Sequence, residues 1–289
     1  MLRSFKKDSN DNTLFITSQC NNKCLMCCQP PTKYDNSISL LNENLKIIQE
    51  APNDITCIGI TGGEPTLASK SLFTILDVIR EKYPTALIHF LTNGRSLSNE
   101  EYIKKLEKYD LNNILFAIPL HSDYAKDHDY IAQANGAYNE TLTGLYNLAN
   151  YEANIELRII INKLNFLRLE QISDFIAYNL PFVENTAFIG MEAIGFAIKN
   201  ADEIWIFPED YQEQLKQAVL KLSRWNLQCS IFNIPFCLLP EELYSFAKQS
   251  ISDWKTVYTN KCNKCKMKTQ CCGLFSTSIW QSKTIHPLL

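Results

Sequence analysis

The sequence predicts an α/β fold, a partial (β/α)6 TIM-like barrel followed by a small cysteine-rich extension. Two observations predict it. Strand-like and helix-like segments alternate along most of the 289 residues, and this rhythm stops near Pro235, where a cysteine-rich tail begins. Six βα pairs are too few for the eight of a closed barrel, so we expect an open one. We therefore place the barrel at residues 1–234 and a separate auxiliary iron–sulfur module at residues 235–289.

The predicted strands are short runs with apolar residues at consecutive positions, typical of strands buried on both faces of a parallel sheet. They are residues 13–18, 55–60, 86–91, 113–119, 155–161, 182–189 and 228–231. The segments between them place apolar residues at helical spacing, and Ser39 is the expected N-cap of the first helix. The predicted helices are residues 40–50, 69–82, 99–109, 138–151, 167–179 and 208–226. The tail has too few residues to build a core, so we expect a metal to hold it.

Composition excludes several classes of function. Lys and Arg number 28 and Asp and Glu 31, so the net charge is −3. The chain therefore lacks the surplus of basic residues that is typical of proteins that bind nucleic acid. No apolar run reaches the ~18 residues of a membrane span, and the N-terminus has no signal-peptide core. We expect a cytoplasmic protein that binds neither a membrane nor nucleic acid.

Eleven cysteines gather mainly at the two ends of the chain. In the reducing cytoplasm they are expected to be metal ligands rather than disulfides. Cys20, Cys24 and Cys27 form a C-x3-C-x2-C loop just after the first predicted strand. Three thiolates can hold three irons of a [4Fe–4S] cluster and leave the fourth iron open. A zinc site, which usually takes four ligands, or incidental buried thiols are the alternatives.

A second motif, Gly62-Gly63-Glu64-Pro65, follows the second predicted strand. Adjacent glycines let a backbone come close to a ligand, and the glutamate adds an acceptor for an ammonium group. Such a turn alone is a weak signal. Combined with the three-cysteine loop one strand earlier, it is a specific one.

Together these motifs resemble the radical S-adenosylmethionine (radical SAM) superfamily. The resemblance implies that the three cysteines bind a [4Fe–4S] cluster, that SAM chelates its open iron, and that the GGEP turn contacts the methionine end of SAM. Reductive cleavage of SAM then gives a 5′-deoxyadenosyl radical, which takes a hydrogen atom from the substrate. An electron donor such as flavodoxin or ferredoxin is implied as a partner. Gly63→Val is expected to block SAM binding and leave the cluster in place.

The same resemblance suggests four further SAM contacts. Met26 and Met191 match positions near adenine, Ser122 a position near the ribose or carboxylate, and Arg158 a partner of the SAM carboxylate. Each has an ordinary structural alternative. The methionines could pack in the core, Ser122 could cap a helix, and Arg158 could pair with Glu156. A lone histidine such as His121 is more often structural than functional.

The tail carries Cys262, Cys265 and Cys271 in a C-x2-C-x5-C pattern, and Cys237 is the best placed fourth ligand. A site with four cysteine ligands is closed, so it would be structural or an electron relay. We favour an auxiliary [4Fe–4S] cluster at this site, and a zinc ion is the alternative.

Several stretches resemble the His-Xaa-Ser system radical SAM maturases, specifically their C-type subfamily. They include CNNKCLMC followed by QPP, ELRIIIN, LPFVENTAFIGMEAIGFA, and SISDWKTVY before the tail cysteines and GLFSTS. The resemblance implies modification of a ribosomally made precursor peptide, alongside a second radical SAM maturase. Only about twelve residues precede the first predicted strand, so we expect no N-terminal extension of the group's kind. The alternatives are a radical SAM enzyme acting on a small molecule or nucleic-acid base, and a non-catalytic iron–sulfur protein that binds a peptide or passes electrons.

Overall fold

The structure is a computed structural model that describes residues 5–7, 9, 12–250, 255–277 and 284–289. One sheet holds seven strands in the order β1 to β7, and the neighbouring pairs with a defined register are parallel. The predicted α/β class with an open parallel sheet is confirmed. The strands are β1 (Thr13–Phe15), β2 (Cys57–Thr61), β3 (Leu87–Leu91), β4 (Ile114–Pro119), β5 (Asn154–Ile161), β6 (Asn185–Gly190) and β7 (Cys229–Phe232).

The six predicted helices are present with shifted ends, and three further helices, α4, α7 and α8, were not predicted. The first helix begins at Ser37, so the predicted cap Ser39 lies inside it, and Asn36 precedes it without a side-chain capping bond. Helix α4 was not predicted, because its sequence AKDHDYIA is short and mostly polar. The helices are α1 (Ser37–Glu50), α2 (Ser69–Lys82), α3 (Glu100–Leu106), α4 (Ala125–Ala132), α5 (Ala137–Asn150), α6 (Leu169–Asn179), α7 (Phe196–Lys199), α8 (Ala201–Ile204) and α9 (Gln212–Arg224).

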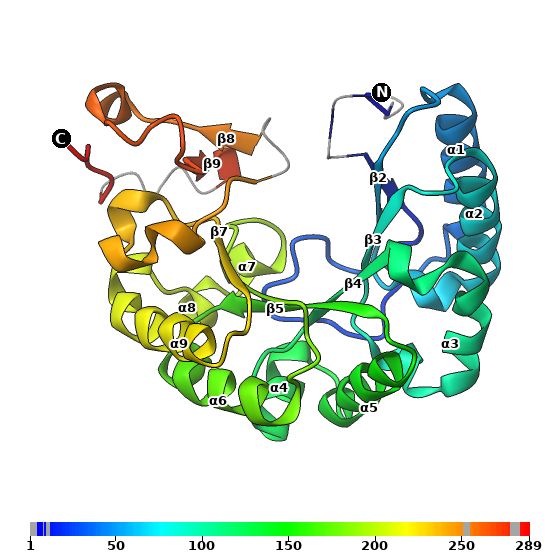
Figure 1. Cartoon of the computed structure of the whole chain (residues 1–289), viewed down its shortest axis with the longest axis horizontal. Coiled ribbons are helices and arrows are strands. Elements are labelled where there is room, and N and C mark those ends of the chain that lie inside the picture. The colour runs from blue at the N-terminus through cyan, green and yellow to red at the C-terminus, as the bar shows by residue number, and fades with distance from the viewer. Residues whose placement is uncertain (1–4, 8, 10–11, 251–254, 278–283) are drawn as a thin grey trace. The chain divides into compact units, whose positions relative to one another are not determined.

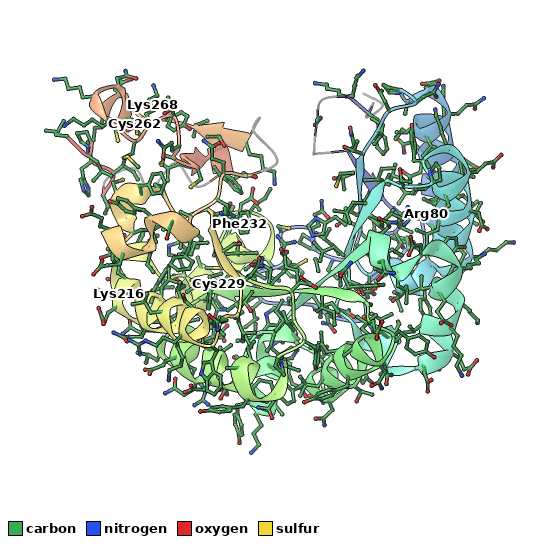
Figure 2. All side chains as sticks on the ribbon, viewed as in Figure 1. Arg80, Lys216, Cys229, Phe232, Cys262 and Lys268 are labelled. Atoms are coloured by element: carbon green, nitrogen blue, oxygen red, sulfur yellow. The ribbon has the colours of Figure 1, made fainter. Side chains whose placement is uncertain are left out.

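One compact unit comprises residues 1–23, 29–119 and 133–156. In it, α1, α2 and α3 run beside β2, β3 and β4 (Figure 1). Apolar side chains of strands and helices, such as Ile58 and Ile75, are fully buried between these layers. Arg80 of α2 (labelled in Figure 2) donates hydrogen bonds to the backbone carbonyls of Ala86 and Tyr109 and so satisfies buried acceptors at the ends of elements.

A second compact unit comprises residues 24–28, 120–132 and 157–289. Here α6 packs on α9, and the outer edge of β7 is covered where Lys248 N–H donates to the Ile231 carbonyl. The tail consists of short 3-10 turns and a two-stranded antiparallel sheet of β8 (Thr256–Val257) and β9 (Leu274–Phe275). Compactness groups the tail with β6 and β7, and the domain boundary at 234/235 stays a prediction.

Among the described residues, none of the helices has the length and apolar composition needed to cross a membrane. Two of the stretches that carry the subfamily resemblance extend beyond the described part of the chain. These are the run before the tail cysteines, through residues 251–254, and the run after them, at residue 278.

Candidate active site and tail cysteine site

The three-cysteine loop follows β1, and the boundary between the compact units falls between Lys23 and Cys24, so its two halves are described separately. In the first half, Cys20 Sγ accepts a hydrogen bond from the Asn22 N–H at 3.3 Å, and Asn93 Nδ2 lies 3.9 Å away. Burial raises the pKa of the Cys20 thiol to about 11. A bound metal ion would let such a thiol ionise at neutral pH, because metal ligation favours the thiolate.

Two side chains hold the backbone next to Cys20. Arg95 Nη1 donates to the Asn21 carbonyl at 2.8 Å and to Asn22 Oδ1 at 2.7 Å, and Arg95 Nε pairs with Glu140. Asn93 Nδ2 donates to Asn21 Oδ1 at 2.6 Å. Sequence reasoning missed both residues, although the Thr-Asn-Gly turn after the third strand was a signal that could have found Asn93.

The GGEP turn is joined to the same segment by its backbone. Gly63 N–H donates to the Thr17 carbonyl, and Glu64 N–H donates to the Gln19 carbonyl, both at 2.7 Å. A Cβ atom on Gly63 would lie 2.2 Å from the Gln19 carbonyl oxygen, and one on Gly62 would lie 2.7 Å from that of Thr17. Both glycines are therefore required for the close approach of two backbones.

The Glu64 carboxylate points into the protein. It is fully buried and accepts hydrogen bonds from Thr66 N–H and Oγ1, from Thr92 Oγ1, and from Asn93 N–H. Burial raises its pKa. The carboxylate thus links the turn to the end of β3, and this geometry gives no support to its expected use as an acceptor for an ammonium group. Pro65 is buried and opens the 3-10 turn that follows.

In the second half of the loop, neighbouring elements fix the backbone. Leu25 N–H donates to the Ile131 carbonyl at 2.9 Å, at the end of α4. Phe196 N–H, at the start of α7, donates to the Cys27 carbonyl at 2.8 Å. Gly195 has a φ of +61°, and a Cβ atom there would lie 2.5 Å from the Cys27 carbonyl oxygen. Glycine therefore allows both the positive φ angle and the close approach of the Cys27 backbone at this position.

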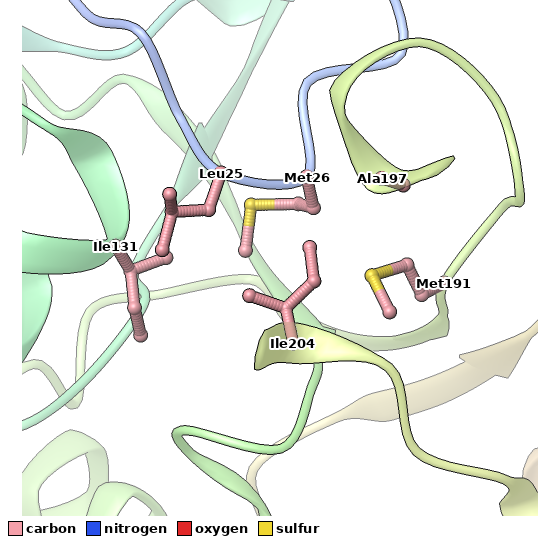
Figure 3. Close-up of a cluster of buried hydrophobic side chains, with 6 residues drawn as sticks. All are labelled: Leu25, Met26, Ile131, Met191, Ala197 and Ile204. Atoms are coloured by element: carbon pink, nitrogen blue, oxygen red, sulfur yellow. The ribbon is translucent and has the colours of Figure 1, made fainter. Parts of the chain in front are cut away.

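Met26 and Met191, the predicted adenine contacts, belong to one buried apolar cluster in this unit (Figure 3). Each is less than a tenth exposed. The cluster satisfies the packing interpretation of both residues, so their contact with adenine stays a prediction. Its other members are Leu25, Ile131, Ala197 and Ile204.

Ser122 and Arg158 were the predicted polar contacts. Ser122 is fully buried, and its Oγ accepts the Tyr124 N–H at 3.1 Å where α4 begins, which matches the capping alternative. Arg158 lies half-buried on β5. Glu156, considered as its structural partner, has Oε1 at 3.8 Å from Nε2 of His89.

His121 lies against the cysteine loop. Its Nε2 is 3.8 Å from Cys24 Sγ, and only 2% of the residue is exposed. The backbone N–H of His121 donates to His128 Nδ1 at 3.2 Å, and its backbone carbonyl accepts from Asn165 Nδ2 at 3.0 Å. The centroids of the two histidine rings are 5.1 Å apart. Burial, with His128 beside it, lowers the pKa of His121 well below 6.5, so the ring is neutral.

The four tail thiols line one cavity that is partly open to solvent. Figure 2 labels Cys262 and Lys268, which both face it. Its cysteines are Cys237, Cys262, Cys265 and Cys271. Across the described ranges, no three His, Cys, Asp or Glu side chains stand in a finished metal-binding arrangement, so these thiols share a space without closing on a common point.

Hydrogen-bond donors surround these tail thiols. A hydrogen bond from Cys272, with the N–H groups of Gly273 and Phe236, lowers the pKa of Cys271 to about 6. Thr259 Oγ1 lies 3.5 Å from Cys262 Sγ. The sequence from 255 to 277 contains five lysines and no Asp or Glu, and one of these lysines, Lys255, pairs with Glu192.

Comparison with known families shows what these features belong to. The family model of the Radical SAM superfamily matches residues 14–180, more than half of the chain. The chain belongs to the radical SAM superfamily. This membership implies a [4Fe–4S] cluster and SAM as cofactors.

Among curated relatives, the Fe-coproporphyrin III synthase of Methanosarcina barkeri is 29% identical to this radical SAM protein over 178 residues, which are 61% of this chain and 43% of that protein. A probable GTP 3′,8-cyclase of Saccharolobus islandicus is 23% identical over 299 aligned positions, covering 100% of this chain and 89% of its own. The chain spans about half the length of the first of these relatives.

Two solved structures share the fold. Streptococcus suis SuiB superimposes with a TM-score of 0.59 at 14% identity, over 76% of this chain and 48% of its own. The structure of anSMEcpe with bound AdoMet and the Kp18Cys peptide gives 0.58 at 16% identity, over 76% and 62%. These matches support the radical SAM partial barrel.

The residues present fit the implied cofactors. Three thiols on one loop are the soft donors that iron–sulfur clusters require, and the loop is fixed by backbone hydrogen bonds on both sides of Lys23. The turn expected to contact SAM is tied to the residue directly before Cys20.

Proposed function

We propose that this radical SAM enzyme modifies a ribosomally made precursor peptide, as a His-Xaa-Ser-type maturase. The observation that carries the catalytic part is the coupling of the GGEP turn to the cysteine loop, through the Glu64 N–H bond to the Gln19 carbonyl. Cys20, Cys24 and Cys27 hold the [4Fe–4S] cluster in this proposal. When bound, the cluster and SAM supply the 5′-deoxyadenosyl radical that takes a hydrogen atom from the substrate.

The remaining residues of the site bind and orient SAM. We assign the methionine end to the backbone of Gly62 and Gly63, because the Glu64 carboxylate already accepts four hydrogen bonds from the protein. Met26 and Met191 would offer the apolar side of the cluster in Figure 3 to adenine.

Ser122 and Arg158 complete this proposed set. Arg158 would pair with the SAM carboxylate, because a guanidinium suits bidentate pairing with a carboxylate. Ser122 keeps an oxygen lone pair for SAM while it caps α4, since a hydroxyl has two.

The tail supplies the second cofactor. We propose that Cys237, Cys262, Cys265 and Cys271 bind an auxiliary [4Fe–4S] cluster with every iron held by protein. Their position around one cavity and the N–H groups of Gly273 and Phe236 at the Cys271 sulfur support this assignment. Such a cluster would accept an electron from a substrate radical or serve as a structural staple. Zinc is the competing occupant.

The peptide substrate rests on the subfamily resemblance, which extends from the cysteine loop to the tail. The partners in this proposal are the precursor peptide, a second radical SAM maturase and an electron donor such as flavodoxin or ferredoxin. The test is co-expression with a small peptide that carries His-Xaa-Ser repeats, followed by mass spectrometry of the peptide. A mass change that disappears in the Cys20/Cys24/Cys27 triple alanine variant is expected. An unmodified peptide in every combination would contradict the substrate assignment.

A small-molecule substrate is the second candidate, because the GTP 3′,8-cyclase relative aligns with the entire chain. The two candidates separate in one experiment. Anaerobic reactions with deuterated peptide or deuterated GTP show which substrate transfers deuterium to 5′-deoxyadenosine. Label from the peptide supports our proposal, and label from GTP replaces it.

A further inference from the structure

We propose that His121 is a positioning residue, whose Nε2–H donates a hydrogen bond to the Cys24 thiolate and raises the reduction potential of the bound cluster. This inference rests on the proposed function, in which Cys24 ligates the SAM-binding cluster. His121 is not part of the three-cysteine motif or the GGEP turn. It follows β4, almost one hundred residues after Cys24 in the sequence.

Several contacts fix the position of the His121 ring. His121 Nε2 lies 3.8 Å from Cys24 Sγ, a distance suited to a weak hydrogen bond to sulfur. The backbone of His121 is held from both sides, by His128 at its N–H and by Asn165 at its carbonyl. The His128 ring packs 5.1 Å away, and only 2% of His121 is exposed. The imidazole is therefore fixed toward the cysteine rather than free to turn to water.

The chemistry of the pair decides which nitrogen carries the proton. A neutral imidazole has one donor nitrogen and one acceptor nitrogen. A metal-bound thiolate has no proton to give, so it can only accept. The Nδ1 atom of His121 is buried with no hydrogen-bond partner among the described residues. Placing the proton on Nε2 directs a donor at the thiolate and leaves only an acceptor lone pair without a partner at Nδ1. The opposite tautomer would bury an N–H without a partner at Nδ1 and set the Nε2 lone pair against the negatively charged sulfur.

A donor at this sulfur has a predictable electronic effect. Hydrogen bonds to the sulfurs are among the factors that set the potential of an iron–sulfur cluster. A reduced cluster carries one more negative charge than the oxidised one, so the donor stabilises the reduced form more. The site is buried, and a hydrogen bond is stronger in the low local dielectric. His121 should therefore make the cluster easier to reduce.

The test compares His121→Phe, which removes the donor, with His121→Gln, which keeps an N–H donor. The control is His89→Phe, because His89 is a partly buried histidine whose Nε2 lies near Glu156. Protein with reconstituted clusters is titrated with a reductant. The potential is read from the paramagnetic signal that changes when SAM is added, since only an open iron responds to SAM. Electron–nuclear double resonance of the same signal detects exchangeable protons near the cluster.

His121→Phe should shift the potential to more negative values and lose one exchangeable proton coupling. His121→Gln should recover part of the potential and part of the proton coupling. His89→Phe should have the potential and the proton coupling of wild type. A wild-type potential and an unchanged proton coupling in His121→Phe would overturn the proposal. If His121→Phe fails to load iron, wild type and His121→Gln are compared instead. An exchangeable proton coupling in wild type that changes in His121→Gln supports the proposal, and the same coupling in both, or none in wild type, overturns it. Failure of the proposed function looks different, because a SAM-responsive signal would then persist after Cys20, Cys24 and Cys27 are replaced.

Discussion

Gly63 lies so close to Gln19 that a Cβ atom on the glycine would sit 2.2 Å from the Gln19 carbonyl oxygen. This contact joins the turn expected to hold SAM to the residue directly before the first cluster cysteine. Gln19 and Gly63 are separated by more than forty residues in the sequence, yet their backbones form one assembly. A side chain at position 63 must therefore displace the segment that leads into the cysteine loop.

Gly63→Ala should accordingly reduce iron loading and not only SAM affinity, which revises the expectation that a valine there would spare the cluster. Overpacking of this kind costs about 1–3 kcal/mol of unfolding free energy. Iron analysis and urea unfolding of the apoprotein measure both effects. Gly136→Ala is the control, because a Cβ atom there meets nothing within 4 Å although φ is +78°. It should lose some stability and keep its iron, and full iron in Gly63→Ala would refute the argument.

Glu64→Gln should destabilise the apoprotein by about 1–3 kcal/mol, the cost of leaving a buried donor unpaired. The two carboxylate oxygens accept from Thr92 Oγ1 and from Asn93 N–H, respectively. In the amide, one of these oxygens becomes an NH₂ group, which cannot accept the hydrogen bond. Urea unfolding gives the difference. The exposed Glu43→Gln in α1 should change stability by less than about 0.5 kcal/mol. Equal effects of the two substitutions would show that the buried network contributes nothing.

Arg95→Met should lower cluster loading by loosening the backbone at Asn21 and Asn22, which Arg95 holds with two hydrogen bonds. Hydrogen bonds to a charged group contribute about 1.5–3 kcal/mol each, so part of the loss should also appear in unfolding. Arg224→Met, at the exposed end of α9, is the matched control and should load iron normally. Normal iron content in Arg95→Met would mean that the loop does not need this anchor.

The strands could be predicted from sequence because apolar runs buried on both faces leave a local signal, and all seven were found. Helix α4 could not, because its eight residues bury little and its start depends on Ser122. The predicted cap Ser39 was wrong by three residues, because the N-cap position is Asn36 and the helix begins without a side-chain capping bond. In the tail, cysteine spacing identified four thiols that line one cavity. The pairing of β8 with β9 was missed, because strands of two residues carry no periodicity.

The supporting residues of the site were harder to find for a physical reason. Asn93, Arg95 and His121 act through contacts with segments more than seventy residues away in the sequence. Their residue types are common in structural roles, and only Asn93 has a local signal, the Thr-Asn-Gly turn after the third strand. The burial of the Glu64 carboxylate was likewise invisible, because it depends on donors from β3.

Elemental analysis of the Cys20/Cys24/Cys27 triple alanine variant tests the auxiliary site, because only the tail cysteines remain in place. About four irons per chain and no zinc are expected from the stoichiometry of one [4Fe–4S] cluster. Stoichiometric zinc without iron would turn the tail into a structural zinc module. Chelation of the metal should also destabilise the tail, which has little apolar core of its own.

The most direct test of the account is the release of 5′-deoxyadenosine from SAM by the reconstituted protein with a strong reductant. Wild type should release it, and the Cys20/Cys24/Cys27 triple alanine variant should release none. The same variant should bind about four fewer irons per chain while it remains folded. Undiminished SAM cleavage by the triple variant would contradict the assignment of these three cysteines to the catalytic cluster.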